Sequence, residues 1–249
     1  MQVLKISGAQ LDQPDFLRQL AETLAQVTEP TVIVHGGGKE ISQLQAAFGI
    51  EPRYLDGLRV SDEQSMGLVI QVLCGSTNAR IVTTLQLAGI EAQGLSGLDR
   101  GLVRAQKMTH PGGDLGRVGE VVSVRAEILN DFLQQHITPV VAPICLGDDG
   151  AYNVNADHVA GAIGASMSAN RVVFLTDVAG VMESEQVLPT LTPGYAEELI
   201  AQGIIIDGMI PKVRTASDLL ARGAKEVLIT NLDGLQKGTG TALMQDTTS

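Results

Sequence analysis

Aromatic residues are scarce in this chain: tryptophan is absent, and Phe and Tyr supply only 3% of its 249 residues. A chain of this length can bury a large core, so Val, Ile, Leu and Ala must fill most of it. Strands that are buried on both faces are rich in such aliphatic residues. The composition therefore favours a parallel sheet with helices on both sides.

Basic residues are also few. The chain has 17 Lys and Arg against 28 Asp and Glu, a formal net charge of −11, and no run of Lys or Arg. Nucleic acid is therefore not an expected partner, and repulsion would slow encounter with another acidic macromolecule. A small anion held in a local basic pocket is compatible with this charge.

Several other functional classes lack their usual signals. Cys74 and Cys145 each lie in an apolar stretch, which predicts buried free thiols and no disulfide. The four histidines lack the spacing and acidic neighbours of a zinc site, so we expect no metal ligands, and no Gly-x-Ser-x-Gly elbow indicates a hydrolase. The longest apolar run, residues 137–146, contains two prolines and is too short for a bilayer. With no leader-like segment before the first strand, we expect a cytoplasmic protein away from membranes.

Apolar strand-like runs alternate with segments of helical periodicity, which predicts an α/β protein: an open αβα sandwich with a mainly parallel central sheet. Polar residues near Asn170 mark the one soft boundary. An antiparallel insertion is expected within residues 102–124. The predicted strands are 2–6, 31–35, 140–144, 171–176 and 226–230, and the predicted helices are 14–27, 40–48, 65–87, 156–168, 193–202 and 211–222.

Three consecutive glycines, Gly36–Gly38, follow the second predicted strand and lead into a helix. Residues without a Cβ let the backbone approach an anion closely, and N–H groups at a helix start attract negative charge. The loop matches neither a Walker A motif nor a dinucleotide fingerprint. It is either an anion cradle or an ordinary turn.

Two lysines lie at unusual positions. Lys5 falls within the apolar run Val3, Leu4 and Ile6, where a lysine is costly unless it reaches solvent or meets an anion. Lys212 lies near a helix start, where a cation opposes the helix dipole. The alternative for both residues is a solvated lysine.

Polar residues also gather before the predicted helix 156–168. Asp157 is placed either to cap that helix or to act as a functional carboxylate, and Asn153 and Asn155 are either turn residues or substrate contacts. Arg59 is suited to pairing with a carboxylate through two hydrogen bonds, although a surface arginine is the alternative.

Seven fragments, in order along nearly the whole chain, resemble the motifs of the amino-acid kinase family. The resemblance is greatest to those members that act on N-acetyl-L-glutamate in arginine biosynthesis. The fragments are Lys5-Ile-Ser-Gly8, Val-His-Gly-Gly-Gly38, Gly57-Leu-Arg59-Val, Asn153-Val-Asn-Ala-Asp157, Leu175-Thr-Asp177-Val-Ala-Gly180-Val, Gly203-Ile-Ile-Ile-Asp-Gly-Met-Ile-Pro-Lys212-Val and Gly238-Thr-Gly-Thr.

The resemblance implies transfer of the γ-phosphoryl group of MgATP to the γ-carboxylate of N-acetyl-L-glutamate, giving N-acetylglutamyl 5-phosphate and ADP. It implies that Lys5 contacts the transferring phosphoryl group, that Lys212 neutralises charge on the leaving oxygen, and that Asp157 orients both lysines. The binding residues that it implies are Gly8, Gly37 and Gly38 for phosphate and the reacting carboxylate, and Arg59 with Asn153 or Asn155 for the rest of the acceptor. A carboxylate is already a competent nucleophile, so charge stabilisation and positioning are the main requirements.

By the same resemblance, residues 1–170 form a lobe that binds the acylamino acid and mediates dimer formation, and residues 171–249 form a lobe that binds ATP. Mg²⁺ would be held mainly by phosphates and water. The residues expected around the base and ribose are Asp177, Val178, Gly180, Val181, Met182, Ile204, Ile205, Ile206, Gly208 and Met209.

Two departures from the family pattern bear on these expectations. Ser7 replaces the first glycine of the usual pair after the lysine, as in some relatives that act on other substrates. The chain begins at the first strand, without the helix that arginine-inhibited hexamers use, which favours an arginine-insensitive homodimer. The alternatives are a kinase for carrier-linked aminoadipate or glutamate, which would need a basic docking face, and a catalytically silent regulator. Retention of Lys5, Asp157 and Lys212 argues against the silent protein.

Overall fold

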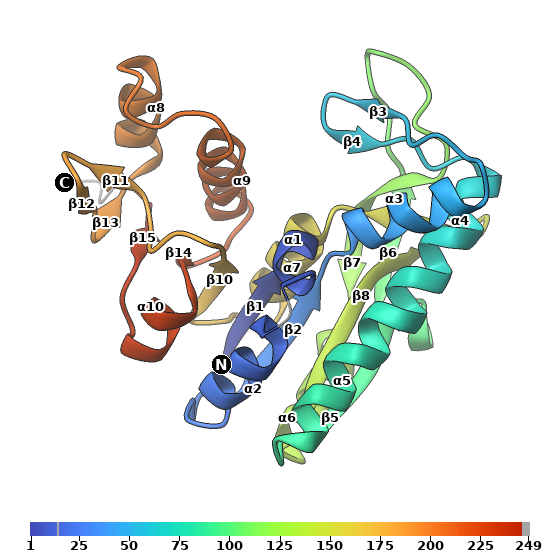
Figure 1. The fold of residues 1–249 in the computed structure, drawn as a ribbon, viewed down its shortest axis with the longest axis horizontal. Helices are drawn as coiled ribbons and strands as arrows, with labels where there is room; N and C mark the ends of the chain where they lie inside the picture. The colour runs from blue at the N-terminus through green and yellow to red at the C-terminus, as the bar shows by residue number, and fades with distance from the viewer. Residues whose placement is uncertain (14, 246–249) are drawn as a thin grey trace.

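An eleven-stranded sheet forms the centre of the molecule (Figure 1). The computed structural model describes residues 1–13 and 15–245. The strand order is β13-β15-β14-β10-β1-β2-β8-β6-β7-β9, and β5 also pairs with β8. The strands are β1 (Gln2–Ile6), β2 (Thr31–His35), β5 (Ala92–Gly97), β6 (Val103–Lys107), β7 (Val118–Val124), β8 (Thr138–Leu146), β9 (Ala151–Val154), β10 (Arg171–Leu175), β13 (Thr190–Leu191), β14 (Val227–Thr230) and β15 (Thr241–Leu243).

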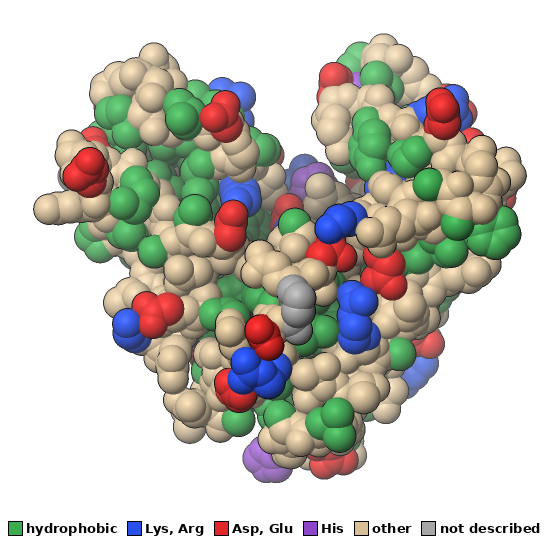
Figure 2. Space-filling model, in the orientation of Figure 1, with side chains coloured by type: hydrophobic (Ala, Val, Ile, Leu, Met, Phe, Trp, Pro, Cys, Tyr) green, Lys and Arg blue, Asp and Glu red, His purple; other side chains and the backbone are tan. Residues whose placement is uncertain are grey.

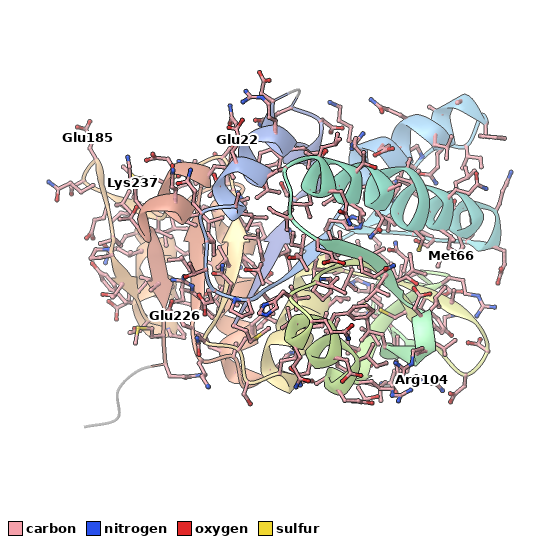
Figure 3. The ribbon with its side chains drawn as sticks, turned by 90° about the horizontal axis from the view of Figure 1, so that it is seen from below. Glu22, Met66, Arg104, Glu185, Glu226 and Lys237 are labelled. Carbon is pink, nitrogen blue, oxygen red and sulfur yellow. The ribbon has the colours of Figure 1, made fainter. Side chains whose placement is uncertain are left out.

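Helices cover both faces of this sheet, because successive side chains of a strand point to opposite faces. In β1, Leu4 and Ile6 pack with α2 (Phe16–Leu24), α5 (Asn78–Leu87) and α10 (Leu232–Lys237). Val3 packs in a second cluster on the other face. Figure 3 shows the two helical layers on opposite sides of the sheet. The helices of the second cluster are α6 (Ala126–Gln134), α7 (Ala156–Ser166), α8 (Pro193–Ala201) and α9 (Met209–Ala221).

The expected αβα sandwich is confirmed. Within the sheet, the neighbouring strands β14, β10, β1, β2 and β8 are all parallel to one another, as predicted. The expected insertion contains an antiparallel pair, β6 with β7. Helix ends differ from the predicted ones by a few residues: α2 ends at Leu24, and Pro14, where that helix was expected to begin, lies outside the described residues.

Most of the missed elements are short or irregular and carry little periodicity, whereas α6 was missed although its apolar residues recur at helical spacing. Strand β5 has the sequence Ala-Gln-Gly-Leu-Ser-Gly, which lacks β-branched residues. The other missed elements are strands β7, β9, β13 and β15 as separate units, the hairpins β3 (Tyr54–Leu55) with β4 (Leu58–Arg59) and β11 (Met182–Glu183) with β12 (Gln186–Val187), and the helices α1 (Gly8–Leu11), α6 and α10.

One continuous helical stretch, Glu63–Leu87, comprises α4 (Glu63–Ile70), the π-helix η1 (Gln71–Thr77) and α5. By length and composition alone it would suffice to cross a membrane, although it contains no unbroken apolar run of that length. Its buried residues, among them Val69, Leu73 and Ile81, pack against the sheet. The stretch is therefore placed as a core helix.

Both cysteines are free thiols, as expected. Cys145 is buried, whereas Cys74 is partly exposed. Burial raises the pKa of the Cys74 thiol to about 11. The group is therefore protonated near neutral pH and is a poor nucleophile.

The carboxyl ends of β1, β2 and β10 lie at one edge of the sheet, because these neighbouring strands are parallel. Above this edge the surface is hollowed between two raised parts of the molecule (Figure 2). One part contains α8 and α9, and the other contains α3 (Gly38–Ala47) and the β3–β4 hairpin (Figure 1). Ligands of open parallel sheets bind beyond such strand ends.

Candidate active site

An ion pair lies at the bottom of this hollow. The ammonium of Lys5 is 2.7 Å from Oδ1 of Asp157, and the two side chains are only 16% and 23% exposed. Lys5 shares the β1 face of Val3, which is the face that α7 covers, and Asp157 lies in the first turn of α7. Lys5 is therefore not a solvated strand-end lysine.

Two cavities adjoin at this pair, and both are lined by Lys5 and Asp157. The first, which we call the β1–β10 cavity, is also lined by Ser7, Gln10, Phe174–Asp177 and Lys212. The second, the β2–β4 cavity, is also lined by Gly36–Gly38, Tyr54, Arg59, Asn153 and Asn155. Their volumes of about 320 and 300 Å³ fall in the range of small-molecule sites.

The triglycine forms one wall of the β2–β4 cavity, and Gly8 packs against it. The N–H of Gly36 donates to the carbonyl of Ile6, at 2.9 Å, which holds the two loops side by side. A Cβ on Gly8 would lie 2.8 Å from the nitrogen of Gly38 and 3.0 Å from that of Gly37. The two backbones approach too closely for a side chain here, and so their N–H groups can reach the same small anion.

Two helices begin at the β2–β4 cavity, so their unpaired N–H groups add positive potential. Helix α3 starts at Gly38 with Gly37 as its N-cap. Helix α7 is capped by Asn155, whose side-chain oxygen accepts from the N–H of Asp157 at 2.8 Å. The interpretation of Asp157 as the cap of this helix is therefore wrong. Its carboxylate pairs with Lys5 instead.

Arg59 is almost fully buried and lines the β2–β4 cavity. Its guanidinium donates to the carbonyl of Gly38 (2.7 Å), to Ser42 (2.7 Å) and to Gln45 (2.5 Å), and it lies 4.8 Å from the ring centre of Tyr54. Burial lowers its pKa, although the group stays charged. The surface-arginine alternative is wrong. This rigidly held cation can offer its remaining donors to an anion.

Asn153 lines the same cavity from β9. Its amide donates to Ser61, which is fully buried, at 3.1 Å. Both predicted asparagines thus lie beside Arg59 in the β2–β4 cavity. Side-chain amides offer a donor and an acceptor, as recognition of another amide requires.

Lys212 was expected to be oriented by Asp157, but the structure pairs it with Asp177. Its ammonium lies 3.9 Å from Asp177, whose side chain is largely exposed, and among the described residues Asp157 forms an ion pair only with Lys5. Both lysines nevertheless line the β1–β10 cavity. The structure brings the two cations to one cavity without a shared carboxylate between them.

The residues expected around the base and ribose differ in their burial and position. Val181 and Ile205 are packed in the core, and Gly180 has a φ of +156° with a Cβ position 2.6 Å from Thr241. Gly208 caps α9, and Met209 is its first residue. Asp177 lines the β1–β10 cavity, whereas the apolar side chains of Val178, Met182, Ile204 and Ile206 are exposed.

Sequence reasoning missed Tyr54, although a local signal was present. Asp56-Gly57 is a strong two-residue hairpin signal, and both residues have positive φ values, 48° and 80°. The turn pairs Tyr54 with Arg59 across β3 and β4, which places the aromatic ring against the guanidinium. Gln45 and Phe174, which lies 5.9 Å from the Lys5 ammonium, carry no such signal.

Within residues 1–13 and 15–245, no cluster of three or more His, Cys, Asp or Glu side chains could hold a metal ion. A divalent cation here would need ligands from a bound phosphate and from water, which Mg²⁺ accepts readily. The cationic, glycine-lined site suits such phosphate groups.

Comparison with known proteins places this site in a family. The sequence profile of the amino acid kinase family matches residues 1–231. The chain belongs to that family. A protein of Roseiflexus castenholzii named acetylglutamate kinase is 49% identical over 238 residues, covering 95% of this chain and 92% of its own. The acetylglutamate kinase of Methanopyrus kandleri is 43% identical over 250 residues, covering 97% and 99%.

The solved structures support the amino acid kinase fold. The N-acetylglutamate synthase of Neisseria gonorrhoeae, solved with coenzyme A and N-acetyl-glutamate, superposes with a TM-score of 0.83 at 23% identity. It covers 99% of this chain and 60% of the synthase chain, and at this identity it shows the fold alone. The family and fold predicted from the motifs are thus confirmed.

Proposed function

We propose that this amino acid kinase phosphorylates N-acetyl-L-glutamate at its γ-carboxylate with ATP, giving N-acetylglutamyl 5-phosphate and ADP. The reaction is that of the acetylglutamate kinases to which the chain is 43–49% identical over nearly its full length. The observation that carries the proposal is the placement of the Lys5–Asp157 pair where two cavities adjoin. A transfer between two substrates needs such a shared boundary.

We assign the β2–β4 cavity to the acylamino acid. Arg59 would bind the α-carboxylate, because its position is fixed by three internal hydrogen bonds before any ligand arrives. Asn153 and Asn155 would bind the acetamide. The N–H groups of Gly37 and Gly38 would then face the γ-carboxylate, at the wall that Gly8 approaches.

We assign the β1–β10 cavity to the phosphates of ATP. Lys5 and Lys212 would neutralise the transferring group and the leaving oxygen, and Lys212 would exchange Asp177 for phosphate. Residues 171–249 would supply the nucleotide lobe, with the exposed Val178, Met182, Ile204 and Ile206 offering apolar contacts to the base. Mg²⁺, when bound, would shield phosphate charge while held by phosphates and water.

The chemistry requires no strong base. A γ-carboxylate oxygen attacks the γ-phosphorus in line, the P–O bond to ADP breaks, and the electron pair stays on the ADP oxygen. The barrier comes from bringing two anions together and from charge on the phosphoryl oxygens. Lys5, Lys212 and the glycine N–H groups lie where that charge forms, and Asp157 keeps Lys5 in place.

An assay of ADP release with N-acetylglutamate, glutamate and aminoadipate tests this function. Turnover with N-acetylglutamate well above the other acids is expected. Turnover only with an acid presented on an acidic carrier protein would indicate the carrier-linked kinase. Ligand binding without ADP release from any acid would indicate a silent regulator. Either result would overturn the proposal.

We further propose that the protein works in the cytoplasm as a homodimer, with residues 1–170 supplying the contacts between copies. The support is the family resemblance together with exposed large apolar side chains in this half, such as Leu87 and Phe48. Light scattering should give a mass near twice the chain mass of 26.2 kDa. A monomer or a hexamer would contradict this.

A further inference from the structure

The helix behind the glycine wall departs from α-geometry over Gln71–Thr77, where it forms the π-helix η1. In a π-turn the hydrogen bonds run from i to i+5, and such turns are rare and often accompany functional sites. The wider turn brings consecutive side chains closer in angle than the 100° steps of an α-helix. Three consecutive residues at its end, Ser76, Thr77 and Asn78, all reach the segment that contains the triglycine.

Two of these contacts hold the start of α3. The hydroxyls of Ser76 and Thr77 donate to the two carboxylate oxygens of Glu40, at 2.6 and 2.8 Å, and Arg80 lies 3.3 Å away. Glu40 is in the first turn of α3, two residues after Gly38. The π-turn therefore fixes the helix start from which the Gly38 N–H projects.

The third contact reaches a buried histidine. His35 is fully buried directly before the triglycine, and its Nε2 lies 3.1 Å from Nδ2 of Asn78. The same Nδ2 donates to the carbonyl of Val140 at 2.9 Å, so this end of the amide is the NH₂ group. Nε2 of His35 must then accept, and Nδ1 carries the proton.

That proton is directed at the backbone of the wall, because Nδ1 lies 3.0 Å from the carbonyl of Gly36. Desolvation lowers the pKa of His35 to about 4, so the ring is neutral near pH 7. The Gly36 carbonyl and the Gly37 N–H belong to one planar peptide unit. A hydrogen bond that fixes the Gly36 oxygen therefore also fixes the direction of the Gly37 N–H. The glycines themselves have no side chain that could hold this orientation.

We propose that His35 and Asn78, supported by the π-turn Gln71–Thr77, are positioning residues that aim the Gly37 and Gly38 N–H groups at the reacting anions. Leu73 of the π-turn also packs against Gly37, since its Cδ2 lies 2.7 Å from the place where a Cβ on Gly37 would be. The role rests on the proposed kinase reaction. His35 and Asn78 line neither cavity, so they would act without touching substrate.

Two substitutions of His35 separate positioning from packing. In His35→Asn the amide nitrogen takes the place of Nδ1 and still donates to the Gly36 carbonyl. In His35→Gln the amide takes the place of Nε2, keeps the contact with Asn78 and loses that donor. We expect kcat to fall about 100-fold in His35→Gln, because small misplacements of reacting groups cost that much. His35→Asn should retain a clearly higher kcat, with KM for ATP similar in both variants.

His136→Asn is the matched control, because His136 is exposed and has a positive φ of 60° that asparagine tolerates. Its kcat should equal that of the unchanged protein. Thermal unfolding of all three variants is measured alongside, since a purely structural role would make kcat follow stability. Equal kcat values for the Asn and Gln variants of His35 would overturn the positioning role.

Nitrogen-15 NMR of the unchanged protein gives a readout that does not depend on activity. The His35 ring should show a protonated Nδ1 and an unprotonated Nε2 between pH 6 and 8. A protonated Nε2 would overturn the network even if the variants of His35 do not fold. By contrast, an unchanged protein that releases no ADP with any acid would overturn the kinase function, and with it the role in catalysis, while leaving this tautomer intact.

Discussion

The Lys5 ammonium and the Asp157 carboxylate, 152 positions apart in the chain, lie 2.7 Å from each other where the β1–β10 and β2–β4 cavities adjoin. A central strand supplies one partner and the first turn of α7 supplies the other. Neither side chain is free to move far, because each is largely buried. The pair thus sets the point at which the two substrates would meet.

Replacing Lys5 by Met should lower kcat about 100-fold to 1,000-fold, the usual cost of removing one donor that stabilises transition-state charge. The KM values should change much less. Coupled ADP release measures both quantities. Lys237→Met is the control, because the Lys237 side chain at the end of α10 is exposed, and it should leave kcat unchanged. An unfolded Lys5→Met protein, judged by circular dichroism, would instead assign Lys5 a structural role.

Alanine at Gly8 should abolish most activity while the protein stays folded. Its Cβ would lie 2.8 Å from the Gly38 nitrogen and would separate the two loops of the wall. Gly67→Ala is the matched control, because nothing lies within 4 Å of its Cβ position in helix α4. That control should raise stability by about 0.5–1 kcal/mol in thermal unfolding. Normal activity of Gly8→Ala would show that the loops do not share an anion.

Arg59→Lys should raise KM for the acylamino acid about tenfold to a hundredfold, because lysine cannot reproduce the fixed guanidinium donors. The KM for ATP should stay nearly constant, since Arg59 lines the β2–β4 cavity and not the β1–β10 cavity. Initial-rate kinetics with each substrate varied separately measure this. Arg53→Lys, with an exposed side chain, serves as control. Equal changes in both KM values would contradict the assignment of the cavities.

Stability should fall as the pH drops from about 6.5 toward 4. His35 has its pKa lowered to about 4 in the folded protein, mainly by burial, while the hydrogen bond to the Gly36 carbonyl and the charge of Glu40 raise it and Arg80 lowers it slightly. Between this value and the unfolded pKa of about 6.5, the unfolded chain binds a proton that the native protein does not. The native state therefore loses stability with falling pH, by about 3 kcal/mol over the whole window.

Urea unfolding at several pH values tests this dependence. In His35→Asn the slope of stability against pH should decrease but not vanish, because burial also lowers the pKa of His158. An unchanged slope in that variant would show that His35 does not carry the effect.

The sequence predicted those parts of the molecule that follow from periodicity and from family motifs. The central parallel strands and the meeting of Lys5, Asp157 and the triglycine were expected, since residues after parallel strands share one sheet edge. Lys212 was expected beside Asp157 and instead lies near Asp177, because that distance depends on how α9 packs and not on the motif.

Other features were beyond reach of the sequence for physical reasons. His35 and Asn78 are 43 positions apart, and their contact depends on tertiary packing that no local pattern encodes. The π-turn has no known sequence signal in residues 71–77. Val181 and Ile205 lie in nucleotide-site motifs of the family, yet their side chains fill the core. A motif is therefore a poor guide to which of its members face a ligand.

The pairing of β1 with β10 along all five residues has a consequence for the two halves of the chain. Strand β1 belongs to the first half and is hydrogen-bonded on its other edge to β2, so the sheet itself joins the first half to the second. A fragment starting at β10 would expose an unpaired, apolar strand edge and would tend to aggregate. We therefore expect the two proposed ligand-binding halves to behave as one cooperative folding unit and to melt together.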